Sequence, residues 1–262
     1  MSKEKKMEKA NQKKTIELIS FSVENWNQTE YHQREIDIIH DSFKRMSENN
    51  ERNIIQNKQE VHKIFELKSN TNDEYDLYFA ELENELELRV NNELEKRFRF
   101  SSFISIISYI ESKLNYICKG LEDDFKFTIK LKDLNSKNDL SKFKLFLFKV
   151  LEIDPIKIKN DFDKLILYYQ IRNYIIHHDG NCIGNNLIEC QNIKNTFRTI
   201  PGIQYIESSL SLNSNNSYSF AIVFEDEKFI ENLLIVYKSF FKNLLECIEN
   251  RIFILNKTKN FD

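Results

Sequence analysis

The sequence predicts a mainly α-helical fold, and three observations lead to that prediction. The 262 residues include only 4 glycines and 2 prolines, whereas β-sandwiches, barrels and glycine-rich phosphate-binding folds need many turn residues. Hydrophobic residues make up 41% of the chain, with 21 Phe and 11 Tyr, which is enough for a sizeable core and excludes wholesale disorder. Apolar residues also recur at steps of three and four over most of the chain. We therefore expect a helical bundle with a long helix and a small β-hairpin before the last helix.

Residues 1–70 are polar and rich in Asn, Lys and Glu, and they predict a charged N-terminal helical arm. Their apolar stripes are narrow and flanked by charge, which is more typical of a hairpin or an arm packed on another surface than of an independent core. The turn cluster Ser69–Asp73 separates this arm from residues 71–262, the expected main helical domain. The stripes contain Ile16, Ile19, Val23, Trp26, Ile36, Ile39, Phe43, Met46, Val61, Ile64, Phe65 and Leu67.

A long helix is expected to run from Glu74 to Cys118 and to stop at Gly120, because glycine readily forms a left-handed C-terminal cap. Its first half spaces apolar residues among many glutamates. Its second half is apolar on most sides and should be buried. The apolar residues of the two halves are Phe79, Leu82, Leu86, Val90, Leu94 and Phe98, then Phe103, Ile104, Ile106, Ile107, Tyr109, Ile110, Leu114 and Ile117.

The remaining elements follow from shorter patterns. Residues 125–132 alternate apolar side chains with lysine and predict a short strand or an extended loop, and a helix follows from about Leu140 to Leu151. A further helix begins near Asn160 or Asp161 and ends at His178, closed by Asp179 and Gly180.

Ile203–Leu212 and Tyr218–Phe224 flank a polar turn at residues 213–217 and predict the hairpin. Glu225 and Asp226 then cap the last helix, whose apolar face carries Phe229, Leu233, Val236, Phe240, Leu244 and Ile248.

Charge and cysteine usage bear on where the protein works. The formal net charge of −3 argues against a strongly basic protein that coats nucleic acid, but allows a local basic patch. No apolar run approaches the roughly 20 residues that span a bilayer, and no signal sequence follows the basic N-terminus. The cysteines, which are Cys118, Cys182, Cys190 and Cys247, have no disulfide-framework spacing. We expect a reduced, cytoplasmic protein that makes no membrane contact.

The stretch from Ile171 to Gly180 is the most informative for function. It ends a strongly apolar helix with Arg172, Asn173, His177 and His178. Arginine holds phosphate with two hydrogen bonds, and histidine titrates near neutral pH, so it serves as a general acid or base. These groups suffice for metal-free RNA cleavage, in which the 2′-hydroxyl attacks its neighbouring phosphate.

This stretch resembles the signature of the HEPN (higher eukaryotes and prokaryotes nucleotide-binding) superfamily: an arginine, a polar residue, a few further residues and a histidine near a helix end. The surroundings are similar as well, with Glu111 in an earlier apolar helix and an Asp-Gly pair after the histidines. The resemblance covers roughly residues 74–250, and only residues 171–180 carry it specifically.

For fold and activity, the resemblance implies a helical bundle that forms a homodimer, with two Arg/His pairs facing each other in one metal-independent ribonuclease site. Members include toxins of toxin–antitoxin pairs, abortive-infection proteins and domains of CRISPR effectors, and some have lost catalysis. A role in phage defence or growth arrest, with an antitoxin or another regulatory partner, is therefore expected. No cofactor and no metal ion are expected.

Each site residue has a functional and a structural interpretation. Arg172 holds the scissile phosphate, His177 transfers the proton, and Asn173 and His178 assist. His178 in place of His177 is an alternative, as is a purely structural role for both histidines beside the helix dipole. Arg172 alternatively forms an ion pair with Glu111 or Asp179. Tyr174 either stacks on a base or packs in the core. Lys126, Lys130 and Lys132 either line an RNA path or form a solvated face.

Two further observations qualify the motif. Arg34 and His40 also satisfy the spacing, but Glu35 follows the arginine and would repel phosphate, so we discount this pair. On an ideal helix, Arg172 and His177 differ by about 140° in direction and do not share a face, whereas Asn173 and His177 do. Cooperation of Arg172 with His177 then requires a distorted last turn, the length of the arginine, or the pair of a partner protomer.

Other functions fit the sequence less well. A zinc site from His177, His178, Cys182 and Cys190 matches no common ligand spacing. No phosphate-binding loop, dinucleotide fingerprint or nucleophile-elbow serine is present. A catalytically inactive module that binds RNA or a protein partner is the alternative to the ribonuclease. A coiled-coil scaffold conflicts with the aromatic residues after residue 100.

Overall fold

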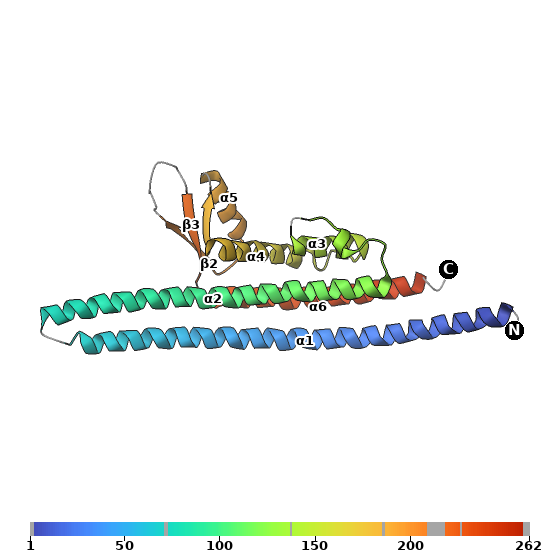
Figure 1. Ribbon diagram of the computed structural model, residues 1–262, viewed down its shortest axis with the longest axis horizontal. Helices are drawn as coiled ribbons and strands as arrows, with labels where there is room; N and C mark the ends of the chain where they lie inside the picture. The colour runs from blue at the N-terminus through green and yellow to red at the C-terminus, as the bar shows by residue number, and fades with distance from the viewer. Residues whose placement is uncertain are drawn as a thin grey trace. The chain divides into compact units, whose positions relative to one another are not determined.

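The computed structural model describes residues 3–70, 73–136, 138–184, 187–208, 218–225 and 227–258. Within them the chain is mainly helical, with a small antiparallel sheet before the last helix, which confirms the predicted fold class (Figure 1). None of the helices in these ranges has both the length and the apolar character to cross a membrane. The long helices are α1 (Lys3–Lys68), α2 (Glu74–Phe125), α4 (Lys159–His178) and α6 (Lys228–Thr258).

The chain packs as two compact units, each assembled from separate stretches of sequence. Unit 1 contains Met1–His40, Asn115–Asp163 and Tyr237–Asp262, and unit 2 contains Asp41–Leu114 and Lys164–Val236. All four long helices contribute residues to both units. The predicted boundary at residue 70, between an N-terminal arm and a main domain, stays a prediction. It divides the chain into consecutive segments, whereas the two units each combine separate segments.

Unit 1 is built on the end of α2, a short 3-10 helix η1 (Leu131–Asp133), α3 (Asp139–Leu145), a π-helical turn η2 (Phe146–Val150) and most of α6. Asn138 caps α3 by accepting a hydrogen bond from the Ser141 backbone N–H at 2.8 Å. The core is aromatic and centres on Phe162, whose ring lies 5.0 Å from that of Phe240. Further fully buried side chains of this unit are Phe146, Leu147, Leu151 and Leu244.

One sequence prediction is wrong in unit 1, and two others become more specific. The α2 helix does not stop at Gly120 but continues to Phe125, and Leu121 in the added turn is buried at 7% exposure. Of the two alternatives for residues 125–132, the strand is wrong and the loop is right for residues 126–130, which connect the end of α2 to the 3-10 helix. The helix expected from Leu140 to Leu151 is α3 followed by the π-helical turn.

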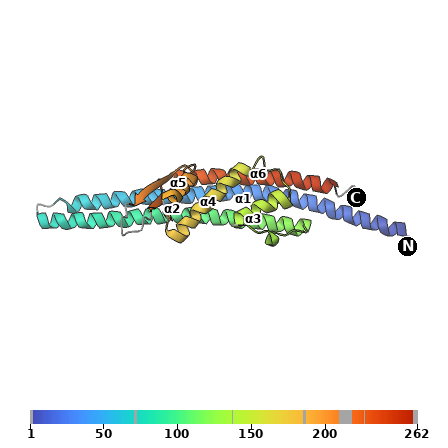
Figure 2. The ribbon, with the colours of Figure 1, turned by 90° about the horizontal axis from the view of Figure 1, so that it is seen from above.

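Unit 2 is built on a helical hairpin, in which the second part of α1 and the first part of α2 lie side by side and antiparallel (Figures 1 and 2). Ile54, Val61 and Ala80 are buried between the two helices. Polar pairs tie the helices together, among them Lys58 with Glu95 at 2.5 Å. Arg99 donates two hydrogen bonds of 2.7 Å to the carboxylate of Glu51. The chain reverses direction between α1 and α2, as expected from the cluster Ser69–Asp73, of which Thr71 and Asn72 lie outside the described residues.

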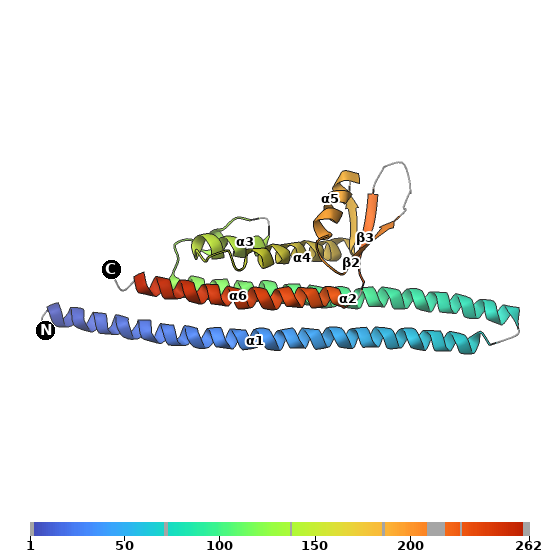
Figure 3. The same cartoon turned by 180° about the vertical axis from the view of Figure 1, so that it is seen from behind.

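The sheet of unit 2 has three antiparallel strands in the order β1 (Asn181–Gly184), β3 (Tyr218–Phe224), β2 (Ile203–Ser208). Ile203 pairs with Phe224 and Ser208 with Ser219, which confirms the predicted hairpin. The strand β1 and the helix α5 (Leu187–Phe197) were not predicted from the sequence. As Figure 3 shows, α5 lies beside the sheet, and Lys194 of α5 lies 5.7 Å from the ring of Tyr205 in β2.

An aromatic cluster joins α2, α4, the sheet and the start of α6 within unit 2. Phe103 is fully buried, with its ring 5.4 Å from Phe224 and 5.1 Å from Phe229. Phe224 and Phe229 stack at 3.8 Å. Gly202, with φ of 81°, lets the turn before β2 approach Phe229, whose backbone N would lie 2.9 Å from an added Cβ.

Several sequence predictions lie outside what the structure describes. They are the hairpin residues 209–217, the cap residue Asp226, and the side chains of Ile16, Ile19, Val23 and Trp26 and of Cys182 and Cys190.

Candidate functional site at the end of α4

The functional stretch forms the last two turns of α4 and the turn that follows. Ile171 and Ile175 are buried on one face, at 0% and 5% exposure, and anchor the helix in unit 2. Arg172, Asn173 and Tyr174 are half-buried, whereas His177 and His178 are exposed. The helix therefore presents its ionisable groups at its C-terminal end, as the sequence predicted.

The Arg172 guanidinium is partly held within its own helix. Its Nη1 donates a hydrogen bond to Asn173 Oδ1 at 3.0 Å, and its Cζ lies 5.4 Å from the centre of the Tyr169 ring. Its Nε is buried and has no hydrogen-bond partner among the described residues. A buried N–H without an acceptor is unfavourable, so this group is a donor that an incoming oxygen would satisfy.

His177 and His178 lie in the last turn of α4, where the helix dipole favours a cation. Their ring centres are 6.5 Å apart. The ring of His178 lies 6.1 Å from that of Tyr174, which in turn contacts the buried Phe197 at 5.5 Å. Tyr174 is thus engaged with α5 on one side and His178 on the other, which is consistent with core packing.

The turn after α4 is built from two left-handed residues. Asp179 has φ of 54° and Gly180 has φ of 76°. The Gly180 N–H donates to the Tyr174 carbonyl at 3.3 Å, and the Gly180 carbonyl accepts from Ile222 of β3 at 2.8 Å. A Cβ on Gly180 would lie 2.8 Å from the Phe100 ring. Glycine is required here both by the backbone conformation and by the close approach to α2.

Two cations of α2 hold the Asp179 carboxylate. Lys96 lies 3.1 Å from Oδ2, and Arg97 contacts both carboxylate oxygens at 3.1 and 3.2 Å. The ion-pair partners of Asp179 are therefore two residues of α2, and the alternative ion pair between Arg172 and Asp179 is not formed. Lys96 and Arg97 are functional neighbours that the sequence analysis missed, because nothing local relates them to a residue 83 positions away.

Arg172 and His177 are not brought together within one chain. The α4 helix is continuous from Lys159 to His178, so no distortion of the last turn overcomes their separation around the helix. No hydrogen bond or ring contact joins the two side chains in the part of the chain that the structure describes. Two groups of predicted site residues are in contact. Arg172 contacts Asn173, and His178 contacts Tyr174 and His177.

The predicted lysines and the second Arg/His pair belong to unit 1. Lys126, Lys130 and Lys132 are exposed, and Lys126 has a left-handed φ of 51°. Arg34, 75% exposed, pairs with Glu30 at 2.6 Å within α1. Arg34 is thus occupied by a neighbouring acid on a solvated helix face, whereas Arg172 retains a buried free donor.

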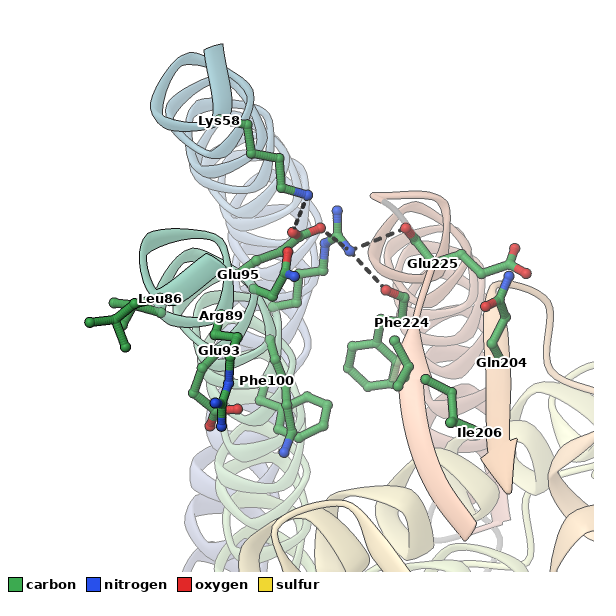
Figure 4. Close-up of a pocket in the computed structure, with 15 residues that line it drawn as sticks. Lys58, Leu86, Arg89, Glu93, Glu95, Phe100, Gln204, Ile206, Phe224 and Glu225 are labelled. Carbon is green, nitrogen blue, oxygen red and sulfur yellow. Dashed lines mark hydrogen bonds and ion pairs between the residues drawn. The ribbon is translucent and has the colours of Figure 1, made fainter. Parts of the chain in front are cut away.

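Unit 2 also contains an open groove that the sequence analysis did not predict. It has a volume of about 930 Å³ and lies between α2 and the β2–β3 hairpin (Figure 4). Leu86, Val90 and Phe100 line it from α2, and Ile206 and Val223 from the hairpin. Lys96 also lines the groove, so the residue that holds Asp179 connects the groove with the end of α4.

The chemistry of the cysteines is limited by burial. Cys118 and Cys247 are free thiols, and burial raises the pKa of each above its ordinary value. Both are therefore poor nucleophiles.

Among the described side chains, no group of three His, Cys, Asp or Glu residues is placed to hold a metal ion. The zinc alternative involves Cys182 and Cys190, whose side chains lie outside that set.

No protein-family model, curated protein or solved structure matches the chain. Function is therefore inferred from its own residues and their geometry.

Proposed function

We propose that the protein is a metal-independent endoribonuclease that acts as a cytoplasmic homodimer, in the manner of the HEPN superfamily. The observation that carries the proposal is the unsatisfied, buried Nε of Arg172 beside a helix end that exposes His177 and His178. A phosphate oxygen is the acceptor that an arginine fork matches best.

The chemistry needs only these side chains. A histidine takes the proton of the RNA 2′-hydroxyl, whose oxygen attacks the adjacent phosphorus while the bond from phosphorus to the 5′-oxygen breaks. A histidine returns a proton to that 5′-oxygen, so the products are a 2′,3′-cyclic phosphate and a 5′-hydroxyl. Arg172 offsets the charge that builds on the phosphoryl oxygens. Asn173 orients Arg172, and His178 assists His177.

The separation of Arg172 and His177 around α4 supports a dimer as part of the proposal. In this arrangement the two facing Arg/His pairs act as two half-sites, each of which takes Arg172 from one protomer and His177 from its partner, so neither helix needs to be distorted. A role in phage defence or as a toxin restrained by an antitoxin is part of the proposal and rests on the family resemblance alone.

The first test is cleavage of a mixed RNA pool in EDTA by wild type, Arg172→Ala and His177→Ala. We expect each variant to lose roughly 10²–10⁴-fold in rate. The RNA fragments made by wild type should carry 5′-hydroxyl ends, so a polynucleotide kinase should phosphorylate them without prior phosphatase treatment. The control is Arg34→Ala, which removes the arginine of the other Arg/His pair and should cut as wild type does. Equal cutting by all of these proteins would reject the site.

Mixing the two inactive variants tests the shared site. A dimer of one Arg172→Ala and one His177→Ala chain contains one site with both residues intact, so mixing should restore about a quarter of the wild-type activity. Sites contained within single protomers would regain nothing on mixing.

The second candidate is a catalytically inactive RNA-binding or protein-interaction module. The hydrogen bond from Arg172 to Asn173 favours it, because it already engages one donor of the guanidinium within the protein. Arg172-dependent RNA binding without cleavage, at any enzyme concentration, would identify this module.

A further inference from the structure

The first part of α2 carries an exposed apolar stripe that continues into the groove. Its members are Tyr75, Phe79, Leu82, Leu86 and Val90, with exposures of 69%, 44%, 43%, 61% and 51%. They lie on one side of the helix, and Leu86 is rotated by about 240° from Ala80, which packs against α1. Five large apolar side chains at this exposure form a patch of the kind that marks interaction sites.

The stripe has the dimensions of a helix-binding surface. From Tyr75 to Val90 it is about 22 Å long, which corresponds to four turns of a partner helix. At its far end Leu86 and Val90 form one wall of the groove, and Ile206 and Val223 form the other. In Figure 4 the side chain of Ile206 points from the hairpin toward α2. A helix lying on the stripe would therefore end between two apolar walls.

Most of the α2 segment that carries the stripe has acidic charge only, and Lys68 of α1 pairs with one of these acids, Glu83. No basic residue occurs from residue 74 to residue 88, whereas acidic residues flank the stripe on both sides. Glu81 and Glu85, one turn apart, repel each other and make no ion pair with another described side chain. The acidic residues of this segment are Glu74, Asp76, Glu81, Glu83, Glu85 and Glu87.

We propose that this surface, Tyr75–Val90 with Ile206 and Val223, binds a basic amphipathic helix of a partner protein. Apolar side chains of that helix cover the stripe, and its lysines or arginines neutralise Glu81 and Glu85. Arg89 lines the groove end of this surface and makes no ion pair with the described residues. A second copy of this chain is a poorer occupant, because its own stripe would bring acidic residues against acidic residues. The proposal is independent of the ribonuclease activity.

Two synthetic helices test this on the full-length protein. They share leucine positions that match the stripe and differ in having lysine or glutamate elsewhere, and binding is followed by fluorescence anisotropy. The lysine peptide should bind one per chain, at least roughly ten-fold more tightly than the glutamate peptide, and more weakly as salt rises.

Substitutions in α2 test whether the lysine peptide binds at the stripe. Leu82→Ser with Leu86→Ser should weaken binding of the lysine peptide by roughly ten-fold or more. Glu81→Gln with Glu85→Gln should weaken it in a salt-dependent way without disturbing any packing. Leu88→Ser is the matched control: Leu88 is 39% exposed on the same helix but lies on another side of it, and its variant should bind normally.

Three results would overturn the proposal. Equal binding of both peptides would show that charge plays no part, and equal loss in the Leu88 variant would show that the stripe is not the site. Sedimentation of wild type as a dimer that Leu86→Ser dissociates would assign the stripe to a second copy instead.

Discussion

The two ends of α2 within unit 2 carry similar apolar residues in opposite environments. Phe79, Leu82 and Leu86 are 43–61% exposed, whereas Phe103, Ile107 and Ile110 are at most 1% exposed. Both ends keep helical spacing on one continuous helix. The buried end faces Tyr168, Phe224 and Phe229, which come from α4, β3 and the start of α6. Burial along α2 is thus decided by which other elements reach it, not by its own pattern.

The largest expected effect comes from truncating one side chain at each end. Phe103→Ala should lower the free energy of unfolding by about 3–5 kcal/mol, because it empties a fully buried aromatic site. Leu86→Ala, at 61% exposure, should change it by no more than about 0.5 kcal/mol. Urea unfolding followed by circular dichroism measures both. Similar losses in the two variants would mean that a partner element covers the open end in solution.

An intermediate effect is expected where the buried end of α2 meets the turn after α4. Gly180→Ala should cost about 1–3 kcal/mol, since the residue has φ of 76° and the added Cβ would touch the Phe100 ring. Gly120→Ala, the same change in the α2 helix with open space around it, should instead stabilise by about 0.5–1 kcal/mol. Thermal unfolding of both variants checks the opposite signs, and a loss in the Gly120 variant would contradict the helical conformation there.

The smallest effect depends on pH. Burial raises the pKa of the Tyr168 phenol well above its ordinary value, so the unfolded chain releases this proton first as pH rises. This contribution to stability is fully present below the unfolded pKa of about 10 and is lost above it. At pH 11 wild type should lose about 1.4 kcal/mol that Tyr168→Phe does not lose.

Urea unfolding of wild type and Tyr168→Phe from pH 8 to pH 11 measures this difference in the free energy of unfolding. Tyr78→Phe, which alters a tyrosine that is 55% exposed at the open end of α2, is the control and should follow the wild-type pH dependence. Parallel curves for wild type and Tyr168→Phe would show that the phenol ionises freely in the folded protein.

Residues 171–180 show how far the sequence predicts the candidate site. The end of α4 at His178, the glycine turn and the exposure of the histidines all follow from local residue types. The contacts that residues 171–180 make with α2 do not follow from local residue types. The clamp on Asp179 comes from Lys96 and Arg97, and the contact that makes Gly180 necessary comes from Phe100. The catalytic roles of Arg172 and His177 stay predictions.

Local residue patterns were enough to predict the helical class, the start of α2, the end of α4 and the β2–β3 hairpin, because periodicity, caps and turn residues act over a few neighbours. The folded chain was needed to show that β1 joins the sheet, that α5 is helical and that α2 continues past Gly120. It also decided which half of the α2 apolar residues is covered and where the groove lies. These features depend on contacts between distant segments, whose free energy no local pattern records.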